Sequence, residues 1–124
     1  MRKKVELEYL FSSSVNVLFS RLSTAMGLSE WFADDVQQNG NSFIFAWDGV
    51  KSRARLQKLK KNLLVRFEWE NGNDDEYFEF RLEVDPLTSD VALIIIDFTD
   101  EEDEDSTIEL WNKQIEMLHR TIGA

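Results

Sequence analysis

Cysteine is absent from the 124-residue chain, and histidine occurs once, as His119. The chain can therefore form neither a disulfide nor a thiolate site. A transition-metal site around His119 would have only carboxylates as further ligands, so we expect no metal and no cofactor. Because His119 follows Leu118 by about 100° on a helix, we interpret it as a boundary residue at the flank of the helix's apolar stripe.

Motifs of common catalytic and ion-binding sites are also missing. The sequence has no glycine-rich phosphate loop and no Gly-x-Ser-x-Gly nucleophile motif. The acidic run 100–105 lacks the residue order of an EF-hand, and we interpret it as a solvated lead-in to a helix. These absences predict that the protein is not an enzyme.

No apolar run approaches the length of a membrane span. The basic residues at 2–4 lead into alternating Val5 and Glu6, and no apolar signal core follows. We therefore expect no membrane insertion and, by default, a cytoplasmic protein. The lack of cysteine is compatible with a reducing compartment.

The formal net charge of -10 disfavours nucleic acids and anionic membrane surfaces as partners, because both present phosphate groups. Hydrophobic residues at 43% and charged residues at 31% are normal for a folded protein. The length fits one domain over residues 1–124. Nine Phe and four Trp are the unusual feature of the composition.

The N-terminal part predicts a strand and two short helices. Apolar residues alternate from Val5 to Phe11, as in a strand with one buried face. The serines at 12–14 offer N-cap hydroxyls to a helix that follows. Its apolar residues are spaced by three and four, at Val15, Leu18, Phe19 and Leu22. A second short helix is predicted over 28–33, with Ser29 as its N-cap.

From Val36 to Phe98 the pattern predicts strands separated by turns. Asp48-Gly49 marks a two-residue hairpin, and a bulge near Lys58 would bring Leu59 back into phase. The segment 71–75 reads as a loop, and the segment 91–98 is apolar on both faces until Asp97, as in a central strand or one covered on both faces. The expected strands cover 43–47, 50–59, 63–69, 78–84 and 91–98.

The C-terminal segment predicts a long helix. Ser106 and Glu109 have the spacing of a capping box, so we expect the helix to begin there. Its apolar stripe consists of Ile108, Trp111, Ile115, Leu118 and Ile122. The inward rows of the strands are the only surface large enough to cover this stripe. The predicted fold is therefore α+β, a curved antiparallel sheet of about six to seven strands wrapped around a long C-terminal helix.

This element order resembles the helix-grip fold of the START-like superfamily over nearly the whole chain. The segment Leu28-Ser29-Glu30-Trp31-Phe32 is similar to the Leu-x-x-Trp-Phe step of the branch named for the heat-shock-protein ATPase activator. A second similarity is the strand that ends in Trp69-Glu70. The resemblance implies a cavity between sheet and helix, and the superfamily includes lipid carriers, receptors, cyclases and chaperone partners.

Three functions are compatible with these patterns. The first is noncatalytic binding of a small hydrophobic ligand between the sheet and the C-terminal helix. The second is a protein-interaction or co-chaperone-like domain with a filled core, and the third is a cyclase-type enzyme. The oligomeric state does not follow from the sequence. The residues predicted to line the ligand site are Phe45, Trp47, Phe67, Trp69, Phe80, Trp111, Ile115 and Leu118, in rows that also contain Phe43 and Phe78.

Two further features bear on the site. Asp97 lies near the end of an apolar strand, where burial would raise its pKa, but we expect edge exposure. An enzyme would need such an acid to face the cavity. Arg53 and Arg55 share one strand face, and the inward phase of Ala54 and Leu56 predicts that both arginines point outward.

Overall fold

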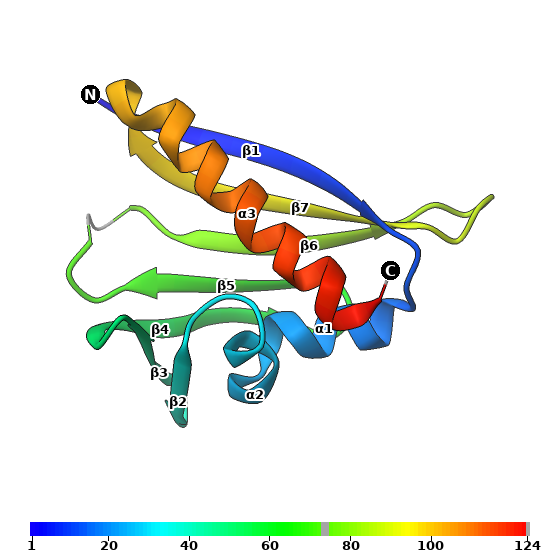
Figure 1. Ribbon diagram of the computed structural model, residues 1–124, viewed down its shortest axis with the longest axis horizontal. Helices are drawn as coiled ribbons and strands as arrows, with labels where there is room; N and C mark the ends of the chain where they lie inside the picture. Colours follow the sequence, from blue (N-terminus) through cyan, green and yellow to red (C-terminus); the bar gives the residue numbers. More distant parts are fainter. Residues whose placement is uncertain (73–74, 124) are drawn as a thin grey trace.

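A computed structural model describes residues 1–72 and 75–123 (Figure 1). Of the predicted loop 71–75, residues 73 and 74 lie outside this description. The elements, in chain order, are β1 (Arg2–Phe11), α1 (Val15–Ser23), α2 (Ala25–Ser29), β2 (Asp35–Asn39), β3 (Ser42–Trp47), β4 (Val50–Lys60), β5 (Leu64–Trp69), β6 (Phe78–Val84), β7 (Val91–Asp100), a 3₁₀ turn (Glu101–Asp103) and α3 (Glu104–Ile122).

The strands form one seven-stranded antiparallel sheet in the order β1-β7-β6-β5-β4-β3-β2. Helix α3 crosses one face of this sheet, and α1 and α2 cover the same side near the end of α3 (Figure 1). The predicted α+β helix-grip arrangement is confirmed. Strand β7 lies between β1 and β6, which agrees with its apolar sequence.

Two local predictions for the sheet are also confirmed. Asp48 and Gly49 join β3 to β4 with φ angles of 48° and 80°, the left-handed pair that a two-residue hairpin loop requires. The register of β4 against β5 shifts between Leu56 and Lys58, as a bulge does. Leu59 then pairs with Val65 on the inner face, although it is 53% exposed at the end of the strand.

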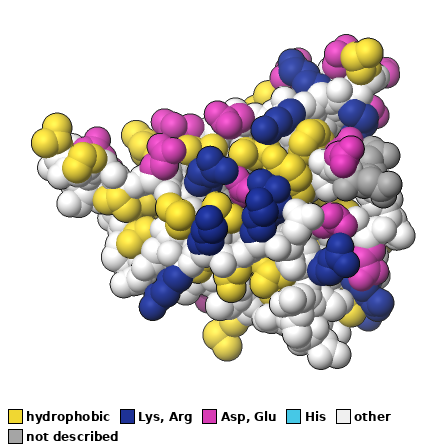
Figure 2. All heavy atoms as spheres, turned by 180° about the vertical axis from the view of Figure 1, so that it is seen from behind, with side chains coloured by type: hydrophobic (Ala, Val, Ile, Leu, Met, Phe, Trp, Pro, Cys, Tyr) yellow, Lys and Arg dark blue, Asp and Glu magenta, His cyan; other side chains and the backbone are white. Residues whose placement is uncertain are grey.

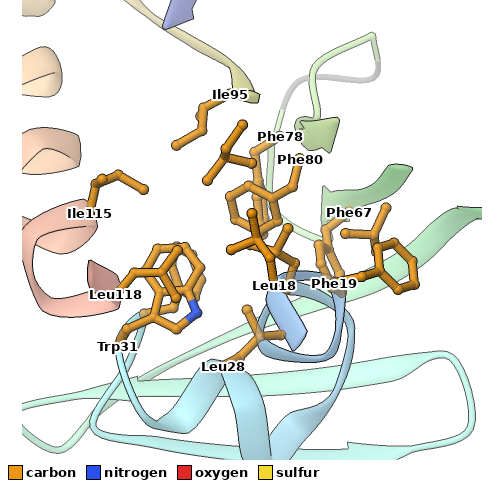
Figure 3. Close-up of a cluster of buried hydrophobic side chains, with 14 of the residues drawn as sticks. Leu18, Phe19, Leu28, Trp31, Phe67, Phe78, Phe80, Ile95, Ile115 and Leu118 are labelled. Atoms are coloured by element: carbon orange, nitrogen blue, oxygen red, sulfur yellow. The ribbon is translucent and has the colours of Figure 1, made fainter. Parts of the chain in front are cut away.

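The space between the sheet and the helices is filled by side chains (Figure 3). Ile115 and Leu118 of α3 are buried against this core, and Trp31 packs on Phe80 with ring centroids 5.5 Å apart. The inner rows of the sheet supply most of the aromatic rings. The fully buried rings are those of Phe11, Phe43, Phe45, Phe67, Phe78 and Phe80.

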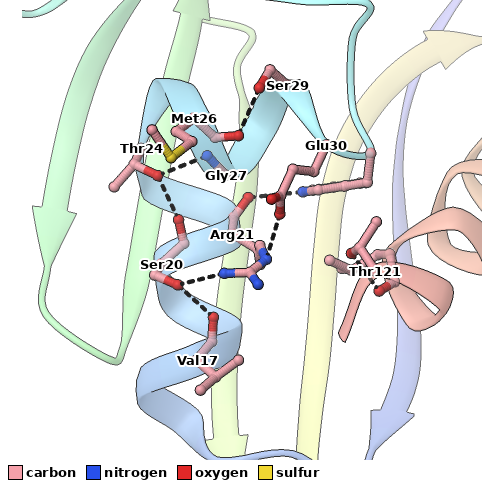
Figure 4. Close-up of polar contacts among 11 residues, drawn as sticks. Val17, Ser20, Arg21, Thr24, Met26, Gly27, Ser29, Glu30 and Thr121 are labelled. Atoms are coloured by element: carbon pink, nitrogen blue, oxygen red, sulfur yellow. Dashed lines mark hydrogen bonds and ion pairs between the residues drawn. The ribbon is translucent and has the colours of Figure 1, made fainter. Parts of the chain in front are cut away.

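The second helix begins earlier than the sequence indicated. Thr24, not Ser29, is the N-cap of α2, and its Oγ1 accepts a hydrogen bond from Gly27 N at 2.9 Å (Figure 4). A Cβ at Gly27 would lie 2.2 Å from the carbonyl oxygen of Ser20, so glycine permits α2 to fold back on α1. Trp31 and Phe32 consequently lie in the turn after α2, not within the helix.

The predicted capping box of α3 is wrong. The 3₁₀ turn begins the winding early, so α3 starts at Glu104 with Asp103 as N-cap and without a side-chain cap bond. The Oγ of Ser106 donates to the carbonyl of Asp103 at 2.9 Å. The Thr107 hydroxyl is hydrogen-bonded to that of Thr99 at 2.8 Å. The apolar stripe itself is confirmed, with Trp111, Ile115 and Leu118 buried.

The outer face of the sheet carries Lys and Arg side chains near its centre (Figure 2). Glu79 lies on this face and is fully buried, because Arg66 and Arg81 form ion pairs with it at 2.8 and 2.9 Å. The described parts of the chain contain no helix that is both long and apolar enough to span a membrane.

Candidate ligand-binding site

A pocket of about 450 Å³ opens between α3, the turn after α2 and the ends of β3, β5 and β7. Its walls are mainly aromatic and it contains one carboxylate. The lining residues are Phe32, Trp47, Trp69, Asp97, Thr107, Leu110, Trp111 and Gln114.

The backbone carbonyl of Phe32 holds one wall of the pocket in place. Trp47 donates to it from Nε1 at 2.8 Å, and Gln114 donates from Nε2 at 3.1 Å. These bonds connect the turn after α2 with β3 and with α3. The Phe32 ring is 5.4 Å from the Trp47 ring and 5.8 Å from the Trp111 ring, measured between centroids.

Trp111 both fills space and walls the pocket. Its ring is 5% exposed and packs edge to face on Phe80, with centroids 5.9 Å apart. Its remaining surface lines the pocket. The core beneath is therefore filled, and the open space lies at one end of the interface between sheet and helix.

The expected exposure of Asp97 is wrong. Asp97 pairs with Val5 on the inner face of β7, an interior strand, and is partly buried beside the pocket. Burial raises the pKa of its carboxyl group above the ordinary value. Hydrogen bonds from Trp111 Nε1 at 2.9 Å and from Phe98 N at 2.8 Å oppose this rise, because they stabilise the charged form.

The structure divides the predicted site residues into two groups. Trp47, Trp69 and Trp111 line the pocket. The other predicted residues are buried in the core and do not line it: Phe45, Phe67, Phe80, Ile115 and Leu118.

Sequence reasoning missed five lining residues, of which three lie on α3. Thr107, Leu110 and Gln114 are spaced by three and four, so they continue one edge of the apolar stripe. This helical spacing is the feature of the sequence from which the three residues could be predicted. The sequence pattern predicts a helical position for Phe32 and an exposed edge for Asp97, whereas both residues line the pocket.

The positions expected for His119, Arg53 and Arg55 agree with the structure. His119 is half-buried at the flank of α3 and stacks on Phe11, with ring centroids 3.9 Å apart. Arg53 and Arg55 are exposed on the outer face. No group of three or more His, Cys, Asp or Glu side chains in the described residues has the arrangement of a metal site.

A larger hollow of about 770 Å³ lies along the other side of the strand ends. Its lining is mainly polar and charged, including Arg2, Arg53, Glu70 and Glu76. Charged and polar side chains are thus interspersed there with the apolar surface of Ile44 and Trp69. The aromatic pocket has the mixture typical of small-molecule sites, namely apolar walls with few polar groups.

The comparisons with known proteins agree with this architecture. The family model for a START-like superfamily domain matches residues 1–124. The chain belongs to the START-like superfamily. A comparison with curated proteins finds no match.

Several solved structures share the START-like fold. The solution structure of BfR322 from Bacteroides fragilis is 33% identical over 97% of this chain and 90% of its own, with a TM-score of 0.68. The Aha1 dimer from Colwellia psychrerythraea has a TM-score of 0.80 at 15% identity, covering 97% of this chain and 96% of its own. CalU16 from Micromonospora echinospora has a TM-score of 0.77 at 15% identity, covering 98% and 76%. At 15% identity, the similarity to the Aha1 dimer and to CalU16 shows a shared fold alone.

Proposed function

We propose that this START-like domain binds a small hydrophobic ligand, without catalysis, in the aromatic pocket between α3 and the strand ends. The observation that carries the proposal is the pocket of about 450 Å³ walled by Phe32, Trp47, Trp69 and Trp111. Its volume is within the range of small-molecule sites. Aromatic walls provide large apolar contact area for a ligand.

The composition of the pocket favours binding over catalysis. Asp97 is the one titratable side chain among the residues that line it. Any general acid–base catalysis in the pocket would therefore depend on this one carboxyl group. Thr107 and Gln114 supply hydrogen-bonding groups, and Thr107 is already bonded to Thr99. These hydroxyl and amide groups are better suited to orienting a ligand than to catalysing its conversion.

The proposal can be tested with a neutral apolar dye such as Nile red, whose fluorescence rises in apolar surroundings. Leu110 is 58% exposed at the rim of the pocket, so Leu110→Arg should obstruct it without disturbing the core. Met117 is also an apolar residue of α3, 42% exposed, and does not line the pocket. Met117→Arg is therefore the matched control.

Wild type and Met117→Arg should bind the dye saturably and melt at a higher temperature in its presence, because binding stabilises the folded state. Leu110→Arg should bind at least about tenfold more weakly. Absence of saturable binding to the wild type, or equal binding by the two variants, would reject the pocket as the ligand site.

A protein-interaction or co-chaperone-like role is the second candidate, supported by the charge of the outer face. Half of the 14 Lys and Arg residues lie between 51 and 66, a segment without Asp or Glu, although the net charge is -10. Lys51, Arg53 and Arg55 are exposed on β4. An acidic protein surface would be complementary to this face. Salt-sensitive binding of an acidic polypeptide, abolished by Arg53→Glu with Arg55→Glu, would support this role.

A further inference from the structure

Within residues 1–72 and 75–123, the carboxylate of Asp97 forms no ion pair. Its hydrogen-bond donors, Trp111 Nε1 and Phe98 N, are uncharged. Arg2 acts on it through space without an ion pair. Burial of a charge is costly unless an opposite charge accompanies it. The pocket thus contains a partly buried negative charge that a bound cation would compensate.

Aromatic rings surround the same space. Phe32, Trp47, Trp69 and Trp111 all line the pocket with Asp97. The Trp47 and Trp69 centroids are 6.3 Å apart at an interplanar angle of 56°, so the two rings form an angled wall. Ring faces carry negative potential and attract ammonium groups, and Trp is the most effective of the aromatic residues.

Of the two charges that act on Asp97 through space, Arg2 is positive and Glu76 is negative, and neither side chain lines the pocket. Apart from Asp97, the pocket is lined by uncharged residues, so no lysine or arginine there repels a cation. The acidic residues 100–105 connect β7 to α3, the elements that carry Asp97 and Trp111. The net charge of -10 adds to a negative potential that attracts cations toward the mouth.

We propose that the ligand is an organic cation, a hydrophobic amine or quaternary ammonium compound, whose positive group lies beside Asp97 and whose apolar body contacts Trp47 and Trp69. This inference rests on the proposed ligand-binding function and specifies the chemical class of the ligand. It assigns Asp97 as a counter-ion for the ligand and not as a catalytic acid.

Choline and its uncharged isostere 3,3-dimethylbutan-1-ol separate charge from shape, because the two molecules differ mainly in the nitrogen. Their dissociation constants can be measured by quenching of tryptophan fluorescence or by calorimetry. Asp97→Asn keeps the side-chain volume and removes the charge. Asp105→Asn is the matched control, because Asp105 is exposed on the first turn of α3 and does not line the pocket.

Wild type should bind choline at least about tenfold more tightly than the alcohol. This preference should fall to within about twofold in Asp97→Asn and persist in Asp105→Asn. If Asp97→Asn folds poorly, the comparison of choline with the alcohol on wild type still tests the cation inference.

Equal affinities of wild type for the two probes would overturn the cation inference while leaving the pocket as an apolar site. A choline preference that survives Asp97→Asn would overturn the counter-ion role. If neither probe binds, and Nile red does not bind either, the proposed function fails and the cation inference fails with it.

Discussion

Trp111 of α3 donates its indole N–H to the carboxylate of Asp97 on β7, with 2.9 Å between Nε1 and Oδ2. This bond joins the long helix to an interior strand at the edge of the aromatic pocket. Each side chain sets the environment of the other: the indole helps to bury the carboxylate, and the carboxylate satisfies a buried donor.

The first prediction concerns the pH dependence of stability. Burial raises the pKa of Asp97 in the folded state above its ordinary value of 3.8, so the folded protein binds a proton that the unfolded chain releases. The stabilisation from this proton is fully present below the unfolded pKa and is lost as pH rises through the folded pKa. Arg2 and the bonds from Trp111 and Phe98 reduce the shift, and Glu76 adds to it.

We therefore expect the free energy of unfolding of wild type, relative to Asp97→Asn, to decrease as pH rises from about 4 toward neutrality. Urea unfolding of both proteins across this range measures the difference. Asp105→Asn serves as control, because its side chain is exposed. A relative stability that instead increased with pH would mean that Asp97 has a lowered pKa in the folded protein.

The second prediction separates the two roles of Trp111. Trp111→Ala should reduce the free energy of unfolding by about 3 to 5 kcal/mol, because it removes a buried ring from between Phe32 and Phe80. Trp111→Phe keeps most of the ring and removes the donor to Asp97, at a cost of about 1 to 2 kcal/mol. Equal losses in the two variants, measured by urea unfolding, would mean that packing of the ring is unimportant.

The third prediction tests the contact between helix and sheet. Ile115 is 2% exposed, so Ile115→Asp would bury an unpaired carboxylate and should cost about 4 kcal/mol or more. Met117→Asp makes a comparable change at an exposed position of the same helix and should cost about 1 kcal/mol or less. A cooperative melt of Ile115→Asp close to that of wild type would refute the placement of α3.

The fourth prediction concerns the acidic lead-in to α3. Glu102 is exposed in the 3₁₀ turn, so Glu102→Gln should change the free energy of unfolding by only about 0.5 kcal/mol or less. Thermal unfolding with and without calcium checks this interpretation. Stabilisation of wild type by calcium that disappears in Glu102→Gln would show that this segment is a cation site.

Much of the fold follows from apolar spacing along the chain. The alternation in β1 and the stripe at Trp111, Ile115 and Leu118 report directly which side of each element is buried. Strand β2 was not distinguished as a separate strand, because Val36 is its one apolar and buried residue. The start of α2 differs from the prediction because Thr24 caps this helix in place of Ser29. The start of α3 differs because a 3₁₀ turn precedes the helix.

The pocket was less predictable than the core. The apolar rows in the sequence show which residues point toward the inside of the sheet. They do not show which of these residues contact solvent at the mouth of the pocket. Trp47 and Trp69 line the pocket because they end their strands, whereas Phe45 and Phe67 lie deeper in the same rows. The position of Asp97 depends on its pairing within the sheet and on Trp111, two relationships between distant parts of the chain.

The most direct test of ligand binding uses the four tryptophans as reporters. Trp47, Trp69 and Trp111 line the pocket, whereas Trp31 lies in the core with its indole bonded to the carbonyl of Arg21 at 2.8 Å. In an NMR titration with benzyl alcohol, a small neutral apolar probe, the indole N–H signals of the three pocket tryptophans should shift saturably. The Trp31 signal should remain in place. Absence of saturable shifts, or equal shifts of all four signals, would contradict a ligand site in this pocket.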